Sequence, residues 1–361
     1  MTAAEEIKTE EKIDFFTLNV GHGDSHVIHF KENKAAVIID PGNSELILQL
    51  LHNQLKIKHI PLILISHGDM DHMGGLNDVI IKCLEDCRGE PVKVGHIFFN
   101  DEGMAKIKDK ARIKKFFEKF RNLAVKHNLK YKYIIANDNS SEILADIFAK
   151  YGIECKMYYP EHVNLLDVHL KNDYNLGSVL FYLVFAKQKI LYTGDLPYAG
   201  WKQVKPGEDL TSDVFKVPHH GGKISNSPGK DTRKILERVN PNFALISVGD
   251  KYNHPLPEVV EAIVTHNTSP HLFCTQMTRQ CCPDEKMKAK IEDFYEKHIK
   301  KRSEKKILKL GSSRGTLCAG TIRVTFDNKT DTLYTSPLVF THHKMLKTLF
   351  NTDRLLCSTR F

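Results

Sequence analysis

Residues 65–76 read ISHGDMDHMGGL and hold four possible metal ligands within six positions, namely His67, Asp69, Asp71 and His72. The combination of imidazole and carboxylate side chains suits Zn²⁺, Mn²⁺ or Fe²⁺. A polar loop that only capped a helix would not need two histidines. The stretch therefore predicts a metal site with coordination positions left open for water.

The flanking sequence predicts where this stretch lies in the fold. Residues 61–66 form a short apolar run that is typical of a buried strand, and residues 76–86 have the spacing of a helix. A loop at the carboxyl end of a strand can turn alternate side chains toward one point. Gly74 and Gly75 permit a close turn into the helix. We therefore expect the four ligands at the end of a strand, just before a helix.

The rest of the chain alternates short apolar runs with amphipathic segments. Strands are predicted at residues 15–20, 27–30, 36–39, 95–99, 153–159, 178–186, 189–193, 214–217, 244–248, 271–275 and 320–326, the last of which is expected to close the main sheet system. Helices are predicted at residues 45–56, 230–239 and 257–266. Strands with interspersed helices favour an α/β layered domain.

Composition excludes several classes of protein. Hydrophobic residues make up 41% and charged residues 27% of the 361 positions, which excludes both a membrane protein and a disordered chain. No apolar run approaches the roughly 18 residues of a membrane span. Residues 1–12 hold four glutamates and no apolar stretch, so they do not resemble a secretory signal. The eight cysteines are scattered through the chain, and we expect them to be reduced thiols, as in a cytoplasmic protein. Because no apolar run is long enough to span a membrane, no membrane contact is expected.

Positive charge is concentrated in two segments. The chain has 52 Lys and Arg against 44 Asp and Glu, a net charge of +8. Residues 105–130 carry ten basic and two acidic residues, and residues 285–310 carry ten basic and five acidic ones. Both segments have the apolar spacing of amphipathic helices. Their basic faces are either solvated outer surfaces or guides for a polyanion such as a nucleic acid.

The motif at residues 67–72 resembles the HxHxDH signature of the metallo-β-lactamase fold, written here as HxDxDH. Further motifs follow in the order of that family, at residues 18–25, 36–42, 175–185, 191–195, 215–222 and 247–255. They resemble in particular the metallo-β-lactamase-like domain of bacterial competence (DNA-uptake) proteins and its free-standing relatives. The resemblance covers about residues 15–264 and 315–326.

This resemblance implies an α/β fold, a single αββα metallo-β-lactamase sandwich domain over residues 1–361. Its core is expected at about residues 13–326. Basic helical insertions are expected at about residues 101–150 and 279–312, and a C-terminal extension at residues 327–361.

The resemblance also implies a metal centre built from several motifs. The expected metal ligands are His67, Asp69, Asp71, His72, Asp195 and His220. Asp71 and His72 are expected on one metal, while His67 and Asp69 face the other. The carboxylate of Asp195 would bridge two cations about 3.5–4 Å apart.

Two departures from the family pattern bear on the metal. Asp69 stands where many relatives have a histidine, and no histidine occupies the third motif near Asn175. Oxygen-rich ligation favours Mn²⁺ or a weakly held second ion. We therefore expect one or two divalent metal ions, Zn or Mn, as cofactors.

The residues expected to act on a substrate are Asp71, Asp195 and His219 in catalysis, and Lys216, Lys223, Asn253 and His254 in substrate binding. The nucleophile would be a metal-bound hydroxide, and His219 would protonate the leaving oxygen or hydrogen-bond a phosphate oxygen. His254 is either a metal ligand or a phosphate contact, and Asp24 is either a site residue or an ordinary turn aspartate. Lys216 and Lys223 either meet phosphates or are isolated surface lysines.

Together these features predict a metal-dependent phosphodiester hydrolase, with a nuclease as the first interpretation and a nucleic acid as its partner. The resemblance further implies an effector, or a partner protein of a multi-component system, in a bacterial defence module. Two alternatives stay open. One is an enzyme for a small phosphodiester such as a cyclic nucleotide or a phosphorylcholine ester. The other is a non-catalytic metal-binding partner subunit.

Overall fold

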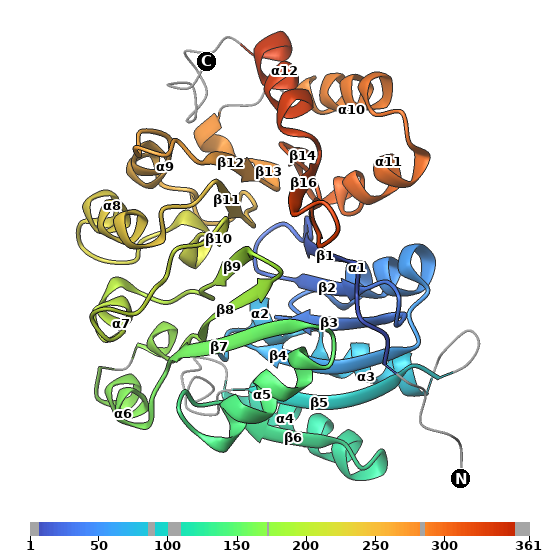
Figure 1. Cartoon of the computed structure of the whole chain (residues 1–361), viewed down its shortest axis with the longest axis vertical. Coiled ribbons are helices and arrows are strands. Elements are labelled where there is room, and N and C mark those ends of the chain that lie inside the picture. Colours follow the sequence, from blue (N-terminus) through green and yellow to red (C-terminus); the bar gives the residue numbers. More distant parts are fainter. Residues whose placement is uncertain (1–6, 86–90, 100–109, 172, 282–285, 351–361) are drawn as a thin grey trace.

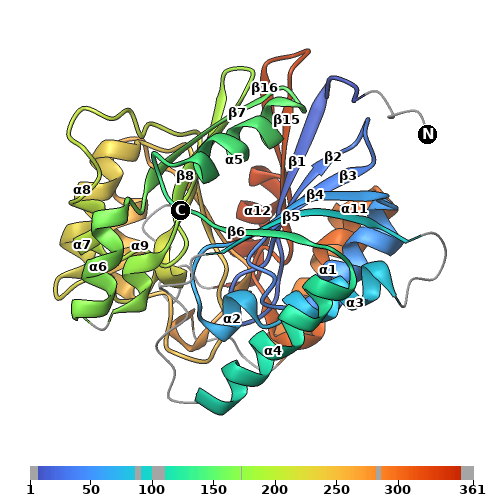
Figure 2. The same cartoon turned by 90° about the horizontal axis from the view of Figure 1, so that it is seen from below.

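Two β-sheets face one another, and helices cover the outer face of each sheet (Figure 1, Figure 2). The computed structural model describes residues 7–85, 91–99, 110–171, 173–281 and 286–350. The arrangement of layers is the αββα sandwich that the sequence predicts. Within the described residues, no helix is both long enough and apolar enough to cross a lipid bilayer.

The first sheet has eight strands. In spatial order they are β16 (Thr332–Ser336), β15 (Ile322–Asp327), β1 (Lys12–Thr17), β2 (His26–Phe30), β3 (Ala35–Ile39), β4 (His59–Ile65), β5 (Lys93–Phe99) and β6 (Lys130–Tyr133). The half from β16 to β3 is antiparallel, whereas β3 to β6 run parallel.

The second sheet has six strands. In spatial order they are β12 (His271–Cys274), β11 (Phe243–Ile246), β10 (Val214–Lys216), β9 (Gln188–Tyr192), β8 (Leu180–Phe185) and β7 (Ile153–Tyr159). Strands β9 to β12 run parallel, while β7 and β8 pair antiparallel with their neighbours. A separate two-stranded ribbon joins β13 (Gln276–Met277) to β14 (Thr316–Leu317).

The helices fall into three groups around these sheets. The first sheet is covered by α1 (Ser44–Leu48), the π-helical turn η1 (Gln49–Leu55), α3 (Leu76–Leu84), α4 (Lys110–Lys126) and α11 (Arg302–Leu308), with the short α2 (Met70–Met73) at its end. The side of the second sheet carries α6 (His162–Lys171), α7 (Tyr198–Trp201), α8 (Pro228–Val239) and α9 (Pro257–Val264). The others are α5 (Asn139–Ala149), which reaches the layer between the sheets, and α10 (Met287–His298) and α12 (Val339–Leu349), which pack on each other.

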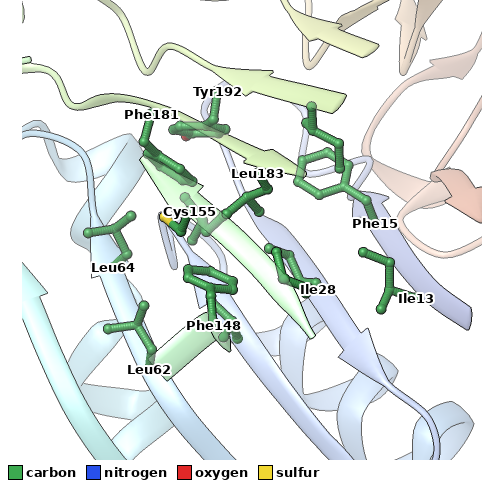
Figure 3. Close-up of a cluster of buried hydrophobic side chains, with 14 of the residues drawn as sticks. Ile13, Phe15, Ile28, Leu62, Leu64, Phe148, Cys155, Phe181, Leu183 and Tyr192 are labelled. Carbon is green, nitrogen blue, oxygen red and sulfur yellow. The ribbon is translucent and has the colours of Figure 1, made fainter. Parts of the chain in front are cut away.

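The layer between the sheets is filled by apolar side chains from both of them (Figure 3). Phe15 and Ile28 come from the first sheet, Phe181 and Tyr192 come from the second, and Phe148 of α5 closes one side. All five side chains are buried. Removal of this apolar surface from water is the main force that holds the two sheets together.

The outer faces of the sheets are apolar as well. Ile63 of β4 packs in one cluster with Val79 of α3, and Phe215 of β10 packs in another with Leu236 of α8. Strands that are covered on both faces read as continuous apolar runs rather than alternating ones. This double burial explains why residues 61–66 are recognisable from sequence as a strand.

Three sequence predictions differ from the structure. Residues 320–326 do not close the sheet system, because β16 pairs antiparallel with β15 beyond them. Residues 130–133, inside a predicted helical insertion, form the edge strand β6. The predicted helix at residues 45–56 is continuous, but its second half, η1, is π-helical. The two missed strands read TLYTS and KYKY, mixtures of polar and apolar residues that become strands only through pairing with a distant neighbour.

Candidate metal centre

The predicted ligands come from loops at one end of the two sheets. The segment with His67 and His72 follows β4, Asp195 follows β9, and His220 follows β10. Strand β4 is parallel to β3, and β9 is parallel to β10. Because the carboxyl ends of parallel strands meet at the same edge of a sheet, these loops converge on one point between the sheets.

One group of possible ligand atoms consists of His67, His72 and Asp195, whose nearest ligand atoms lie within 4.8 Å of one another. All three residues are buried, and His72 Nε2 lies 3.4 Å from Asp195 Oδ2. Burial alone would raise the pKa of Asp195, but His220 and His72 hold it well below its usual range. Burial lowers the pKa of His67. Burial alone would lower the pKa of His72, but Asp195 and Asp40 raise it well above its usual range. A divalent cation would take the place of this positive charge beside the ionised aspartate.

A second group consists of His22, Asp71 and His220. His22 Nε2 lies 2.9 Å from Asp71 Oδ2, and His220 Nε2 lies 3.8 Å from the same oxygen. The two groups are adjacent, since His220 Nε2 is also 3.5 Å from Asp195 Oδ2. Asp195 thus lies between them, as a bridging carboxylate would.

The ring nitrogens facing away from the centre are anchored. Nδ1 of His67 lies 3.0 Å from Ser66 Oγ, and Nδ1 of His220 lies 3.0 Å from the Ser247 carbonyl oxygen. In contrast, Nε2 of His67, His72 and His220 has no hydrogen-bond partner, although each of these atoms is buried. An anchored Nδ1–H leaves the lone pair of Nε2 free for a metal, and such anchoring is typical of metal-binding histidines. The residues therefore fit one or two divalent cations.

Asp40, at the end of β3, orients two of these histidines. Its Oδ2 accepts hydrogen bonds from His72 Nδ1 at 2.8 Å, from Ser66 Oγ at 2.6 Å and from the Tyr192 hydroxyl at 2.5 Å. The Ser66 hydroxyl that donates to Asp40 in turn accepts from His67 Nδ1. One buried carboxylate thus positions both His67 and His72.

Replacement of Asp40 with asparagine should weaken metal affinity by about 10- to 100-fold, because the amide presents an N–H group where donors now point. Asparagine, like aspartate, tolerates the positive φ of 51° at this position. Titration against a chelator of known affinity measures the change. Tyr192→Phe is the matched control, since it removes one donor and keeps the carboxylate. Equal affinities of Asp40→Asn and the wild type would contradict the positioning role.

A buried ion pair lies next to the centre. The ammonium of Lys216 contacts the carboxylate of Asp24, and both side chains are fully buried. Lys216 Nζ also donates to the Gly194 carbonyl oxygen at 2.9 Å and lies 3.6 Å from Asp195 Oδ1. Burial by itself would lower the pKa of Lys216, but Asp24 and Asp195 raise it overall. Lys216 is therefore a fixed internal cation beside the metal ligands.

The turn after β10 has an unusual backbone. His219 and His220 have φ values of 52° and 53°, in the left-handed region that residues other than glycine rarely adopt. Each such residue costs of order 1–3 kcal/mol, and strained residues of this kind cluster at functional sites. The turn directs the ring of His220 into the buried centre, while His219 stays half-buried.

Comparison with known proteins identifies the fold. Residues 18–141, about a third of the chain, match the family model described as the metallo-beta-lactamase superfamily. The chain has a metallo-β-lactamase fold. The finer resemblance to competence proteins stays a prediction.

The solved structures that match the chain are distant in sequence. The metallo-β-lactamase-fold protein YhfI from Bacillus subtilis is 10% identical, with 73% of this chain and 95% of that chain covered and a TM-score of 0.43. The short form of human tRNase Z is 13% identical, with 66% of this chain and 93% of that chain covered and a TM-score of 0.37. Zn²⁺-bound PqqB from Methylobacterium extorquens is 9% identical, with 69% of this chain and 84% of that chain covered and a TM-score of 0.39. No curated protein matches the sequence.

In this metallo-β-lactamase fold, five of the six predicted ligands fall within the two groups, and Asp69 does not. Its side chain is 47% exposed, and its Oδ2 lies 3.8 Å from His67 Nε2. Its backbone carbonyl oxygen accepts hydrogen bonds from the amides of His72 and Met73 in α2. The expected division between the metals also differs, because His72 groups with His67 and Asp195, whereas Asp71 groups with His22 and His220.

The residues predicted to bind substrate are spread over different environments. His219 and His254 are half-buried, with ring centres 5.7 Å apart, and Lys223 and Asn253 are exposed. Burial and the neighbouring histidines lower the pKa of His254 to about 4. The prediction that Lys216 is a phosphate contact or a surface lysine is wrong. Its ammonium is enclosed and paired with Asp24, so it does not reach a bound phosphate.

Sequence analysis missed His22 and Asp40 as site residues and left Asp24 open. His22 and Asp24 belong to the GHGD segment at residues 21–24, in which a histidine two positions before an aspartate was the available signal. Asp40 reads as the first residue of an Asp-Pro-Gly turn, and nothing local distinguishes it from an ordinary turn aspartate. Its role arises from Ser66, His72 and Tyr192, which are distant in sequence.

Proposed function

We propose that the protein is a metal-dependent hydrolase of phosphodiesters and that its substrate is a nucleic acid. The observation that carries this proposal is the convergence of three unpartnered histidine Nε2 atoms on the carboxylate of Asp195. When bound, one or two divalent cations would supply Lewis acidity and an activated water. Adjacent ligand groups that share a carboxylate suit cleavage of a phosphodiester, since the attacking oxygen and the leaving oxygen both carry charge in the displacement.

The protein's own residues would hold the substrate and move its protons. His67, His72 and His220 would hold the cations, with their orientation set by Asp40, Ser66 and Ser247. His219 and His254 lie half-buried beside this centre. Burial lowers the pKa of His219, so its neutral ring can donate one hydrogen bond to a phosphate oxygen or to the leaving oxygen.

Ion pairs neutralise part of the charge of both basic segments. On α4, Lys119 pairs with Asp78 at 3.2 Å and Lys126 pairs with Glu85 at 2.9 Å, both on the side of α3. These pairs neutralise part of the face that the sequence predicts as a polyanion guide. Lys108 of that segment lies outside the described residues. In the second segment, Glu296 pairs with Lys305 and with Lys309, and Lys297 pairs with Asp293. Both segments keep basic side chains that form no ion pair among the described residues, so we propose that each contributes to nucleic-acid binding.

The test is incubation of the purified chain with single-stranded DNA, RNA and bis(p-nitrophenyl) phosphate, each with Mn²⁺, Zn²⁺ or Mg²⁺. We expect hydrolysis of a nucleic acid. The two ligand groups hold four imidazoles and two carboxylates, a set that suits Zn²⁺ as well as Mn²⁺. Affinity for nucleic acid should fall steeply with salt, with a slope of about −0.7 per phosphate contact on single strands.

The other outcomes are equally informative. Rapid hydrolysis of the chromogenic diester with no cleavage of DNA or RNA would favour an enzyme for a small phosphodiester. A metal-loaded protein that cleaves none of the substrates would contradict the proposed function and favour a binding subunit. The partner protein and the defence role implied by the resemblance stay predictions.

A further inference from the structure

A basic pocket lies on the outer side of the first sheet, between α11, the turn at residues 309–314 and the start of α1. Its volume is about 580 Å³. Five cationic side chains line it, namely Arg302, Lys305, Lys306, Lys309 and Arg314, against the two carboxylates of Glu45 and Glu296. The lining is therefore net positive by three charges.

The ion pairs of the pocket leave two cations available. Glu296 pairs with Lys305 at 2.8 Å and with Lys309 at 2.9 Å, and Glu45 pairs with Arg314 at 2.9 Å. Arg302 and Lys306 form no ion pair with any residue that the structure describes, and both side chains are exposed. Because they are four positions apart on α11, they lie on the same face of the helix.

The pocket is joined directly to the metal centre by the loop at residues 18–24. Asn19 Nδ2 donates to the Gly311 carbonyl oxygen at 3.1 Å, which holds this loop against the pocket wall. A Cβ atom placed on Gly21 would lie 3.9 Å from Cβ of Arg314. The next residue, His22, belongs to the second ligand group, so the same loop contacts both the pocket wall and the metal centre.

We propose that this pocket binds backbone phosphates of a nucleic-acid strand whose scissile diester lies at the metal centre. Repeated phosphates on one chain are the chemistry that fits both places, because one loop contacts both of them. Lysine and arginine contacts to phosphates supply most of the sequence-independent affinity for nucleic acids. This inference rests on the proposed function and adds to it that the substrate is longer than a single nucleotide.

The test compares two double charge reversals in the full chain. The first variant, Arg302→Glu with Lys306→Glu, alters the pocket. The second, Lys150→Glu with Lys230→Glu, is the control. Lys150 lies at the end of α5 and Lys230 on α8, and both are exposed and form no ion pair within the described residues. Binding of fluorescein-labelled oligothymidylate and of the matching RNA is measured by anisotropy in EDTA over a range of salt concentrations. Circular dichroism confirms that each variant folds.

We expect the pocket variant to bind at least tenfold more weakly at low salt, with a salt slope smaller by about 1.4 for two lost contacts. The control should stay within about twofold of the wild type. Equal losses in both variants, no loss in the pocket variant, no binding by the wild type, or equal competition by polyglutamate would overturn the proposal. If the wild type binds through the pocket but hydrolyses no diester, the proposed function fails and the binding site stands.

Discussion

Replacement of both Asp71 and Asp195 with alanine should remove nearly all bound metal from the protein and abolish hydrolysis. The two carboxylates belong to different ligand groups, and Asp195 lies between them, so neither group keeps an anionic ligand in this variant. Elemental analysis of the wild type should give one to two transition-metal ions per chain. The double variant should retain less than about a tenth of that amount, since removal of ligands costs far more than the 10- to 100-fold lost with their supporting groups.

Asp69→Ala is the matched control for this experiment. Asp69 belongs to the same motif but lies outside both ligand groups, with a half-exposed side chain. Its removal should leave the metal content unchanged. Full metal occupancy in the Asp71, Asp195 double variant would contradict the assignment of the centre, and metal loss in Asp69→Ala would restore Asp69 as a ligand.

Replacement of Lys216 with methionine should lower the free energy of unfolding of the metal-free protein by about 3–5 kcal/mol, because it leaves the carboxylate of Asp24 buried without its cation. Methionine keeps most of the volume and removes only the charge. The double variant Lys216→Met, Asp24→Asn should recover a large part of the loss, since the unpaired charge is then gone. Urea unfolding followed by circular dichroism measures the three values.

Lys223→Met tests whether the effect is specific to the buried lysine. Lys223 follows the same histidine pair but is exposed, so its replacement should change stability by less than about 0.5 kcal/mol. If Lys216→Met and Lys223→Met unfold at the same urea concentration, the ion pair with Asp24 contributes nothing to the fold.

The local parts of the fold could be predicted from sequence. Strand β4, the ligand motif and α3 follow one another within residues 59–84. The spacing of apolar residues predicts the strand and the helix. His67, Asp71 and His72 could be singled out as candidate ligands as well, because four possible ligands within six positions have few other uses. Asp195 and His220 were predicted from the resemblance, through motifs that follow in the order of the family. The structure places both beside His67, Asp71 and His72.

The edges of the first sheet and the supporting residues of the centre were decided by tertiary structure. β6 and β16 have mixed sequences and become strands only beside β5 and β15. Asp40 and Lys216 acquire their roles from partners that are distant in the chain.

The sequence by itself determined the sheet-and-helix layers and the main ligand motif, because apolar periodicity and ligand spacing are properties of neighbouring residues. Only the tertiary structure decided that Lys216 is an internal cation, that Asp69 lies outside the ligand groups and that His22 lies inside one. Burial and distance are set by the packing of one sheet against the other. The sequence around a lysine does not show whether its ammonium is solvated or buried against a carboxylate.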